Sequence, residues 1–167
     1  LDGGGEYIED GGTFALDLST DSLSDDSKNI VGARMVMTYS EDETSTGIGC
    51  LASGGASEAD TITGVLSHIG FNGSASGQNQ DSGPTSHETL VEWYDASLIG
   101  NVTGVSMADI EAGLNANGAG LGAYSVEISV DVSTGGGVGC THTDNGENVD
   151  YVIELIALEY TVIEIKE

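Results

Sequence analysis

The chain has 167 residues, and 28 Asp and Glu against three Lys and Arg give it a formal net charge of −25 at pH 7. Nucleic acids and anionic membranes are bound through clustered Lys and Arg, so this charge argues against both as partners. Almost no carboxylate has a side-chain cation available, and the surface must be neutralised by solvent cations or by bound metal.

Acidic chains with few aromatic residues are often disordered. Three runs argue against disorder here because they are apolar and rich in β-branched residues: Ile30–Tyr39, Tyr124–Val132 and Tyr151–Ile165. No apolar segment is long and uncharged enough to cross a membrane, so we expect no direct membrane insertion. The length suits one domain with a hydrophobic core, spanning residues 1–167.

The first half of the chain predicts strands separated by polar loops. Leu1–Gly5 is glycine-rich and predicts a flexible start, whereas Thr13–Leu18 alternates apolar and polar residues as a half-buried strand does. Ile30–Tyr39 predicts the next strand, and Ile62–Phe71 resumes the apolar pattern. Asn72–His87 is the longest polar stretch and contains the only proline, so it predicts an exposed loop.

The second half predicts more strands and one helix. Glu88–Ile99 and Gly122–Val132 have strand patterns, and Ser106–Asp109 resembles a capping box at the start of a short helix. Asp150–Ile165 is apolar on both faces, which predicts a strand covered on both sides or one whose second face awaits a partner. Short strands with glycine-rich turns and a single helix favour an all-β fold, an antiparallel, jelly-roll-like β-sandwich.

Four of these segments resemble successive strands of secreted jelly-roll modules: Glu6–Phe14, Arg34–Tyr39, Gly122–Ile128 and Asp150–Leu155. The similarity is to the P-domain of proprotein convertases and to the pre-peptidase C-terminal domains of microbial exoproteins. It is a likeness of strand pattern over about half of the chain. The resemblance implies a non-catalytic module that binds calcium in its loops.

The two cysteines, Cys50 and Cys140, follow similar Ser-Thr-Gly-rich segments, each after a strand-like run. If both strands run the same way through one sandwich, their loops emerge at the same end and a disulfide is feasible. The alternative is two buried free thiols. A disulfide would indicate an oxidising, extracellular location.

Calcium is the metal that the acidic loops favour, because it takes carboxylate, amide and carbonyl oxygens in flexible geometry. The first candidate loop gathers such oxygens around a glycine turn, and its ligands would be Asp144, Asn145, Glu147, Asn148 and Asp150. Asp21–Asp26, Glu41–Glu43 and Glu58–Asp60 are further acidic clusters. For each cluster the alternative is a solvated acidic loop.

The sequence predicts no enzyme. His68, His87 and His142 are the only histidines, and none has a partner at helical metal-ligand spacing. Trp93 and Tyr94 could form an aromatic platform that binds a glycan. The alternative is that Trp93 is a core residue. Asn72 and Asn101 fit the N-glycosylation pattern.

The last predicted strand also suggests self-assembly, because it is apolar on both faces and could complete a sheet in a neighbouring copy by strand addition, which would bury an apolar face. That face carries Ile153, Leu155, Ile163 and Ile165. We therefore expect a secreted, non-catalytic structural protein that is stabilised by calcium and forms an extracellular filament or surface assembly. The alternative is a carbohydrate- or protein-binding accessory module of an exoprotein.

Overall fold

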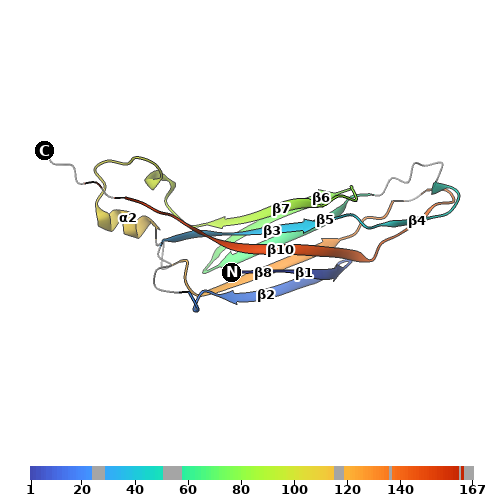
Figure 1. Ribbon diagram of the computed structural model, residues 1–167, viewed down its shortest axis with the longest axis horizontal. Helices are drawn as coiled ribbons and strands as arrows, with labels where there is room; N and C mark the ends of the chain where they lie inside the picture. The colour runs from blue at the N-terminus through green and yellow to red at the C-terminus, as the bar shows by residue number, and fades with distance from the viewer. Residues whose placement is uncertain (24–28, 51–57, 115–118, 136, 162, 164–167) are drawn as a thin grey trace.

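The computed structural model describes residues 1–23, 29–50, 58–114, 119–135, 137–161 and 163, and it consists mainly of two facing antiparallel sheets (Figure 1). The first sheet has the strand order β1 (Asp2–Glu9), β10 (Gly146–Ala157), β3 (Ile30–Tyr39), β7 (Thr85–Glu92). The second has the order β2 (Thr13–Ser19), β8 (Ala123–Asp131), β5 (Asp60–His68), β6 (Phe71–Asn79).

Consecutive strands of the sandwich alternate between the two sheets, and the exception is the β5–β6 hairpin. Two four-stranded sheets connected in this way form a jelly roll. The predicted antiparallel, jelly-roll-like sandwich is therefore confirmed. The predicted helix is also present as α2 (Met107–Leu114), where Ser106 Oγ accepts from the backbone N–H of Asp109 at 3.1 Å.

Alternating side chains of the two sheets form the core. The inward residues of three central strands are Ala33, Met35, Met37 and Tyr39 of β3, Tyr124, Val126, Ile128 and Val130 of β8, and Val149, Tyr151 and Ile153 of β10. Gly64 of β5 faces two of them, and a Cβ at this position would lie 2.6 Å from the side chains of both Met35 and Met37. The glycine therefore lets the sheets approach closely.

Trp93 closes the core at the end of the sandwich that carries α2. It is buried, and its indole Nε1–H donates to the carbonyl of Ile30 at 2.9 Å. His68 lies between Trp93 and Tyr124, stacked on the tyrosine ring with centroids 4.0 Å apart. Trp93 is thus a core residue and does not form an exposed glycan platform.

Two segments predicted to be irregular are strands. Leu1–Gly5 is not a flexible start, because β1 begins at Asp2 and pairs with β10, where Tyr151 covers Gly4. Asn72–His87 is not a loop, because most of it belongs to β6 and β7. Conversely, the strand predicted over Glu88–Ile99 ends at Glu92 and is followed by the short 3-10 helix η1 (Ala96–Leu98).

The inward residues in the middle of β6 are small because β6 packs closely there against β7 of the other sheet. A Cβ on Gly73 would lie 2.1 Å from the carbonyl oxygen of Leu90, and one on Gly77 would overlap the ring of His87. Ala75 lies between these two glycines on the same face. An apolar-periodicity pattern does not detect such a strand, since its packing depends on the absence of side chains.

The last strand does not lie at the edge of its sheet. β1 pairs with Gly146–Ile153 and β3 pairs with Asp150–Ala157, so β10 lies between two strands, and β1 leaves Glu154–Ala157 uncovered on its side. Ile153 is buried in the core and Leu155 packs against it. Of the other proposed assembly residues, Ile163 is 80% exposed beyond the end of β10, and Ile165 lies outside the described residues.

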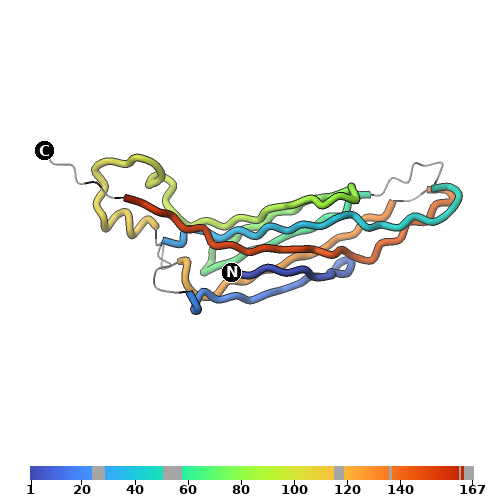
Figure 2. Tube along the Cα trace, viewed as in Figure 1, coloured from blue at the N-terminus to red at the C-terminus, as the bar shows by residue number. Residues whose placement is uncertain are grey.

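An arm extends from the sandwich at the end opposite α2 (Figures 1 and 2). We define the arm as residues 43–50 and 137–143. Its two chain segments pair as β4 (Thr44–Thr46) and β9 (Thr141–Thr143), and the predicted disulfide Cys50–Cys140 joins them. The strands β3 and β8 thus deliver both cysteines to the same end, as the sequence suggested.

Candidate metal centre

Four carboxylates from separate parts of the chain converge at the base of the arm. Glu41 follows β3, Asp60 is the first residue of β5, Asp144 directly follows β9, and Glu147 is the second residue of β10. One ligand oxygen from each of these side chains lies within 4.8 Å of the others. We call this group the acidic cluster. The jelly-roll topology creates it, since β3, β5 and β10 all have an end here.

Glu147 is fully buried, as Asp60 is, and it differs from the other members of the acidic cluster in having neither carboxylate oxygen held by a donor. Its alternation with Val149 and Tyr151 places the side chain on the inner face of β10, where it is 0% exposed. Neither of its carboxylate oxygens has a hydrogen-bond partner. A carboxylate without a partner in the protein interior is strongly unfavourable, so Glu147 is a candidate ligand for a cation.

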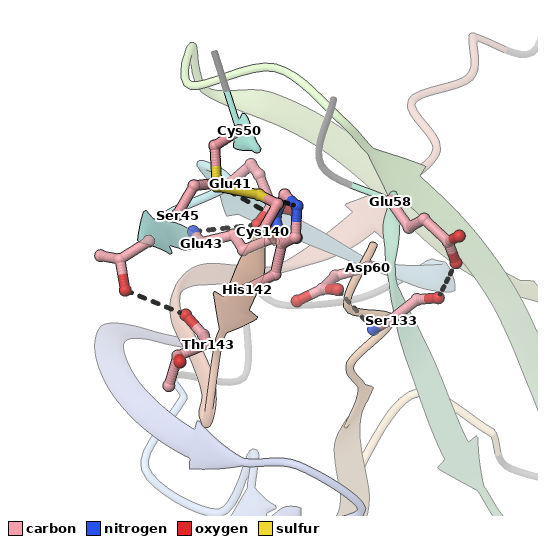
Figure 3. A network of polar contacts seen from close by, with 11 residues as sticks. Glu41, Glu43, Ser45, Cys50, Glu58, Asp60, Ser133, Cys140, His142 and Thr143 are labelled. Carbon is pink, nitrogen blue, oxygen red and sulfur yellow. Dashed lines mark hydrogen bonds and ion pairs between the residues drawn. A yellow bond between two sulfur atoms is a disulfide. The ribbon is translucent and has the colours of Figure 1, made fainter. Parts of the chain in front are cut away.

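The other three carboxylates are each held by a backbone N–H. Glu41 Oε1 accepts from Glu43 at 3.1 Å, Asp60 Oδ1 accepts from Ser133 at 2.7 Å, and Asp144 Oδ1 accepts from Gly146 at 2.9 Å. In each case the second oxygen is buried and has no partner. Figure 3 shows the bond that orients Asp60. In metal sites, hydrogen bonds of this kind orient the side chains that bind the ion.

The acidic cluster therefore contains five buried oxygens without a donor: Glu41 Oε2, Asp60 Oδ2, Asp144 Oδ2 and both oxygens of Glu147. The ion pairs in the described part of the chain are elsewhere, since they join Arg34 to Glu88 and Glu154, and His142 to Glu43. In the described part of the chain, no cationic side chain therefore forms an ion pair with a carboxylate of the acidic cluster.

Burial raises the pKa values of three carboxyl groups of the acidic cluster, those of Glu147, Glu41 and Asp60. The pKa of Glu147 rises to about 9, first through burial and then through its neighbour Asp60. Burial likewise raises the pKa of Glu41 to about 7, against the opposing effect of the N–H of Glu43. The pKa of Asp60 is also raised, mainly by burial. Without a cation, part of the cluster is therefore protonated near neutral pH.

The ligand set fits a hard cation. All of its ligands are carboxylate oxygens, whereas zinc prefers nitrogen and sulfur. Calcium binds six to eight oxygens in flexible geometry, and magnesium is rarely enclosed by an all-protein cage. The acidic cluster therefore fits calcium best.

The structure brings only part of the predicted loop into the acidic cluster. Asp144 and Glu147 belong to it, but Asn145 is exposed, and Asn148 and Asp150 alternate onto the outer face of β10. Glu41 and Asp60 come instead from two of the other acidic segments. The signal that could have identified Asp60 and Glu147 is an acidic residue in phase with the buried positions of an apolar strand.

A second polar network links the acidic cluster to the disulfide (Figure 3). His142 Nδ1 contacts the carboxylate of Glu43 and lies 3.1 Å from Ser45 Oγ, while its Nε2 lies 3.1 Å from Cys140 Sγ. Cys50, Cys140 and His142 converge like metal ligands. The two sulfurs are joined as a disulfide, however, so they offer no thiolate for a metal.

Asn72 and Asn101 are both exposed, as glycan acceptors must be, and their glycosylation stays a prediction. His68 is buried in the core, where the N–H of Gly120 donates to its Nε2 at 2.7 Å and its Nδ1 lies 2.8 Å from the carbonyl of Ala123. In the described part of the chain, no helix is long and apolar enough to span a membrane.

No protein-family model and no curated protein sequence matches this chain. The resemblance to P-domains and pre-peptidase C-terminal domains therefore stays a prediction. The functional argument rests on the geometry of the acidic cluster.

Proposed function

We propose that this protein is a non-catalytic extracellular β-sandwich module that binds one calcium ion in the acidic cluster. The observation that carries the proposal is the set of five buried oxygens without partners, three of them on carboxylates oriented by backbone N–H groups. Calcium bound there would neutralise Glu41, Asp60, Asp144 and Glu147 and join the ends of β3, β5 and β10 to the arm.

The extracellular location is supported by the disulfide Cys50–Cys140, because disulfides persist in oxidising compartments. Extracellular calcium modules bind with dissociation constants of about 0.1–1 mM. The net charge of −25 also suits an exterior with abundant cations.

Calorimetric titration and thermal unfolding test the proposal. We expect calcium to bind with a stoichiometry of one, and calcium in large excess to stabilise the fold by about 2 kcal/mol or more. The gain must exceed that of sodium chloride at matched ionic strength. An equal gain from the sodium salt would show that screening suffices and would refute the specific site.

Two isosteric substitutions localise the calcium effect. Glu147→Gln changes a fully buried carboxylate, neither of whose oxygens has a partner, and should abolish calcium binding. Asp150→Asn makes a similar change on the outer face of the same strand and should leave binding intact. Equal calcium affinity in the two variants would place the ion elsewhere.

The non-catalytic character is supported by the placement of the histidines. His68 is engaged by backbone groups, His142 is held by Glu43 beside the disulfide, and His87 packs against Gly77 of the facing sheet. These three side chains lie on different strands with separate partners, which does not favour a shared catalytic centre.

A second proposal is that the protein is a subunit of an extracellular filament or surface assembly. Two observations favour it: Ile163 is 80% exposed, and β1 does not extend along Glu154–Ala157 of β10. Sedimentation velocity with calcium should then show association that is lost when the chain is truncated after Glu159. A full-length monomer at high concentration would favour the alternative of a binding module.

A further inference from the structure

The disulfide and the acidic cluster lie at opposite ends of the same short arm. Along the β4–β9 ladder, Thr46 pairs with Thr141 next to the disulfide, and Thr44 pairs with Thr143 next to the base. Asp144 directly follows this last pair. One segment of the arm, residues 137–143, is therefore followed directly by Asp144 of the acidic cluster. The other segment, residues 43–50, begins two residues after Glu41.

A continuous line of contacts connects the two ends. Cys140 Sγ lies 3.1 Å from His142 Nε2, and His142 Nδ1 contacts the carboxylate of Glu43. The backbone N–H of Glu43 donates in turn to Glu41 Oε1 at 3.1 Å. The side chains of His142 and Glu43 are 3% and 1% exposed, so the line runs through the interior of the arm.

The ladder alone gives the arm little support. β4 and β9 have three residues each, and the side chains of Thr44, Ser45 and Thr46 are exposed. A two-stranded ribbon of this length is marginal in water without a further constraint. The disulfide supplies that constraint at the far end of the arm, whose two segments lead to Glu41 and Asp144.

We propose that the Cys50–Cys140 disulfide and calcium binding at the acidic cluster are thermodynamically coupled. The oxidised protein binds calcium more tightly than the reduced protein, and bound calcium makes the disulfide harder to reduce. This inference rests on the proposed calcium site. The redox step is the exchange with a dithiol: the S–S bond takes up two electrons and two protons to give two cysteine thiols, and the dithiol becomes a cyclic disulfide.

The two effects must be equal because they close one thermodynamic cycle. The factor by which reduction weakens calcium binding is also the factor by which calcium shifts the thiol–disulfide equilibrium. We expect at least a tenfold effect, which corresponds to about 30 mV for a two-electron couple.

The decisive experiment equilibrates the protein with mixtures of reduced and oxidised dithiothreitol, either with calcium or with a chelator at matched ionic strength. Free thiols are counted by alkylation and intact mass. Calcium should shift the midpoint toward the disulfide in the unmodified protein and in Asp150→Asn, but not in Glu147→Gln. An equal shift in Glu147→Gln, or no shift in the unmodified protein, overturns the coupling.

A second measurement addresses the reduced state directly. The Cys50→Ser, Cys140→Ser double variant is titrated with calcium after circular dichroism has verified its β-structure. A folded variant that binds at least tenfold more weakly supports the coupling, and one that binds with unchanged affinity overturns it. Should the variant not fold, the dithiothreitol equilibrium decides alone. Failure of the oxidised protein to bind any calcium refutes the proposed function itself.

Discussion

Glu147 occupies a core position with an ionisable side chain, and this makes the metal-free protein sensitive to pH. Its pKa rises from 4.5 in the unfolded chain to about 9 in the fold. Because the pKa of Glu147 is higher in the folded state, its protonation contributes to the free energy of unfolding. This contribution is fully present below about pH 4.5 and is lost as the pH rises toward 9. Glu41 adds a loss of the same sign up to about pH 7.

We therefore predict that the metal-free protein unfolds at a lower temperature at pH 9 than at pH 5, by roughly 5 °C or more. Thermal unfolding with a chelator measures this. The unfolding temperature should change much less with pH in Glu147→Gln, whose side chain does not ionise. A pH dependence that is the same in both proteins would contradict the assignment to Glu147.

Ile69 is the one described β-branched residue with a left-handed backbone. It occupies the two-residue turn between β5 and β6 with a φ of 43°, followed by Gly70 with a φ of 82°. Both positions of such a turn favour asparagine and glycine. A left-handed conformation costs an L-residue of this kind about 1–2 kcal/mol.

Replacing Ile69 by asparagine should raise the free energy of unfolding by about 1 kcal/mol, since the side chain is already 54% exposed and little burial is lost. Chemical denaturation of the two proteins measures the change. Ile69→Val keeps the β-branch and serves as the control. If Ile69→Asn proved no more stable than Ile69→Val, backbone strain would not be the cause.

At the level of elements, β6 depends on glycine where it approaches β7. Gly73→Ala would place a Cβ 2.1 Å from a backbone carbonyl that cannot rotate away. We predict a loss of about 2–3 kcal/mol in unfolding free energy, as for overpacked cores. Gly83→Ala is the matched control because its Cβ would meet nothing within 4 Å. Similar stability losses in both variants would contradict a close approach of the sheets.

The same comparison of elements shows what the sequence could predict. β3 has the predicted bounds Ile30–Tyr39, because its core-facing residues are large and alternate clearly. β6 escaped detection because the core-facing residues that follow Phe71 are Gly73, Ala75 and Gly77, which give no apolar period. The disulfide could be predicted since only one pairing exists, whereas Glu41 and Asp60 join Asp144 and Glu147 only through the strand order, which the sequence did not disclose.

The molecule as a whole carries a net charge of −25, and self-repulsion opposes its compact state. We predict that sodium chloride stabilises the metal-free protein, because the screening length falls from about 10 Å at 0.1 M to about 3 Å at 1 M. Unfolding temperature against salt concentration measures this. Glu147→Gln should show a comparable rise, since most of the charge lies elsewhere, and a flat profile would contradict the prediction.

The disulfide also changes the covalent topology of the chain. Cys50 and Cys140 are 90 residues apart, so the bond closes a ring that contains β5, β6, β7 and β8. A protease that cuts the exposed turn at residues 81–84 would open this ring without separating the chain into two molecules. The nicked protein would stay one covalent molecule, heavier by the water added in hydrolysis, until the disulfide is reduced, whereas a cut outside the ring would release a fragment from the covalent structure at once.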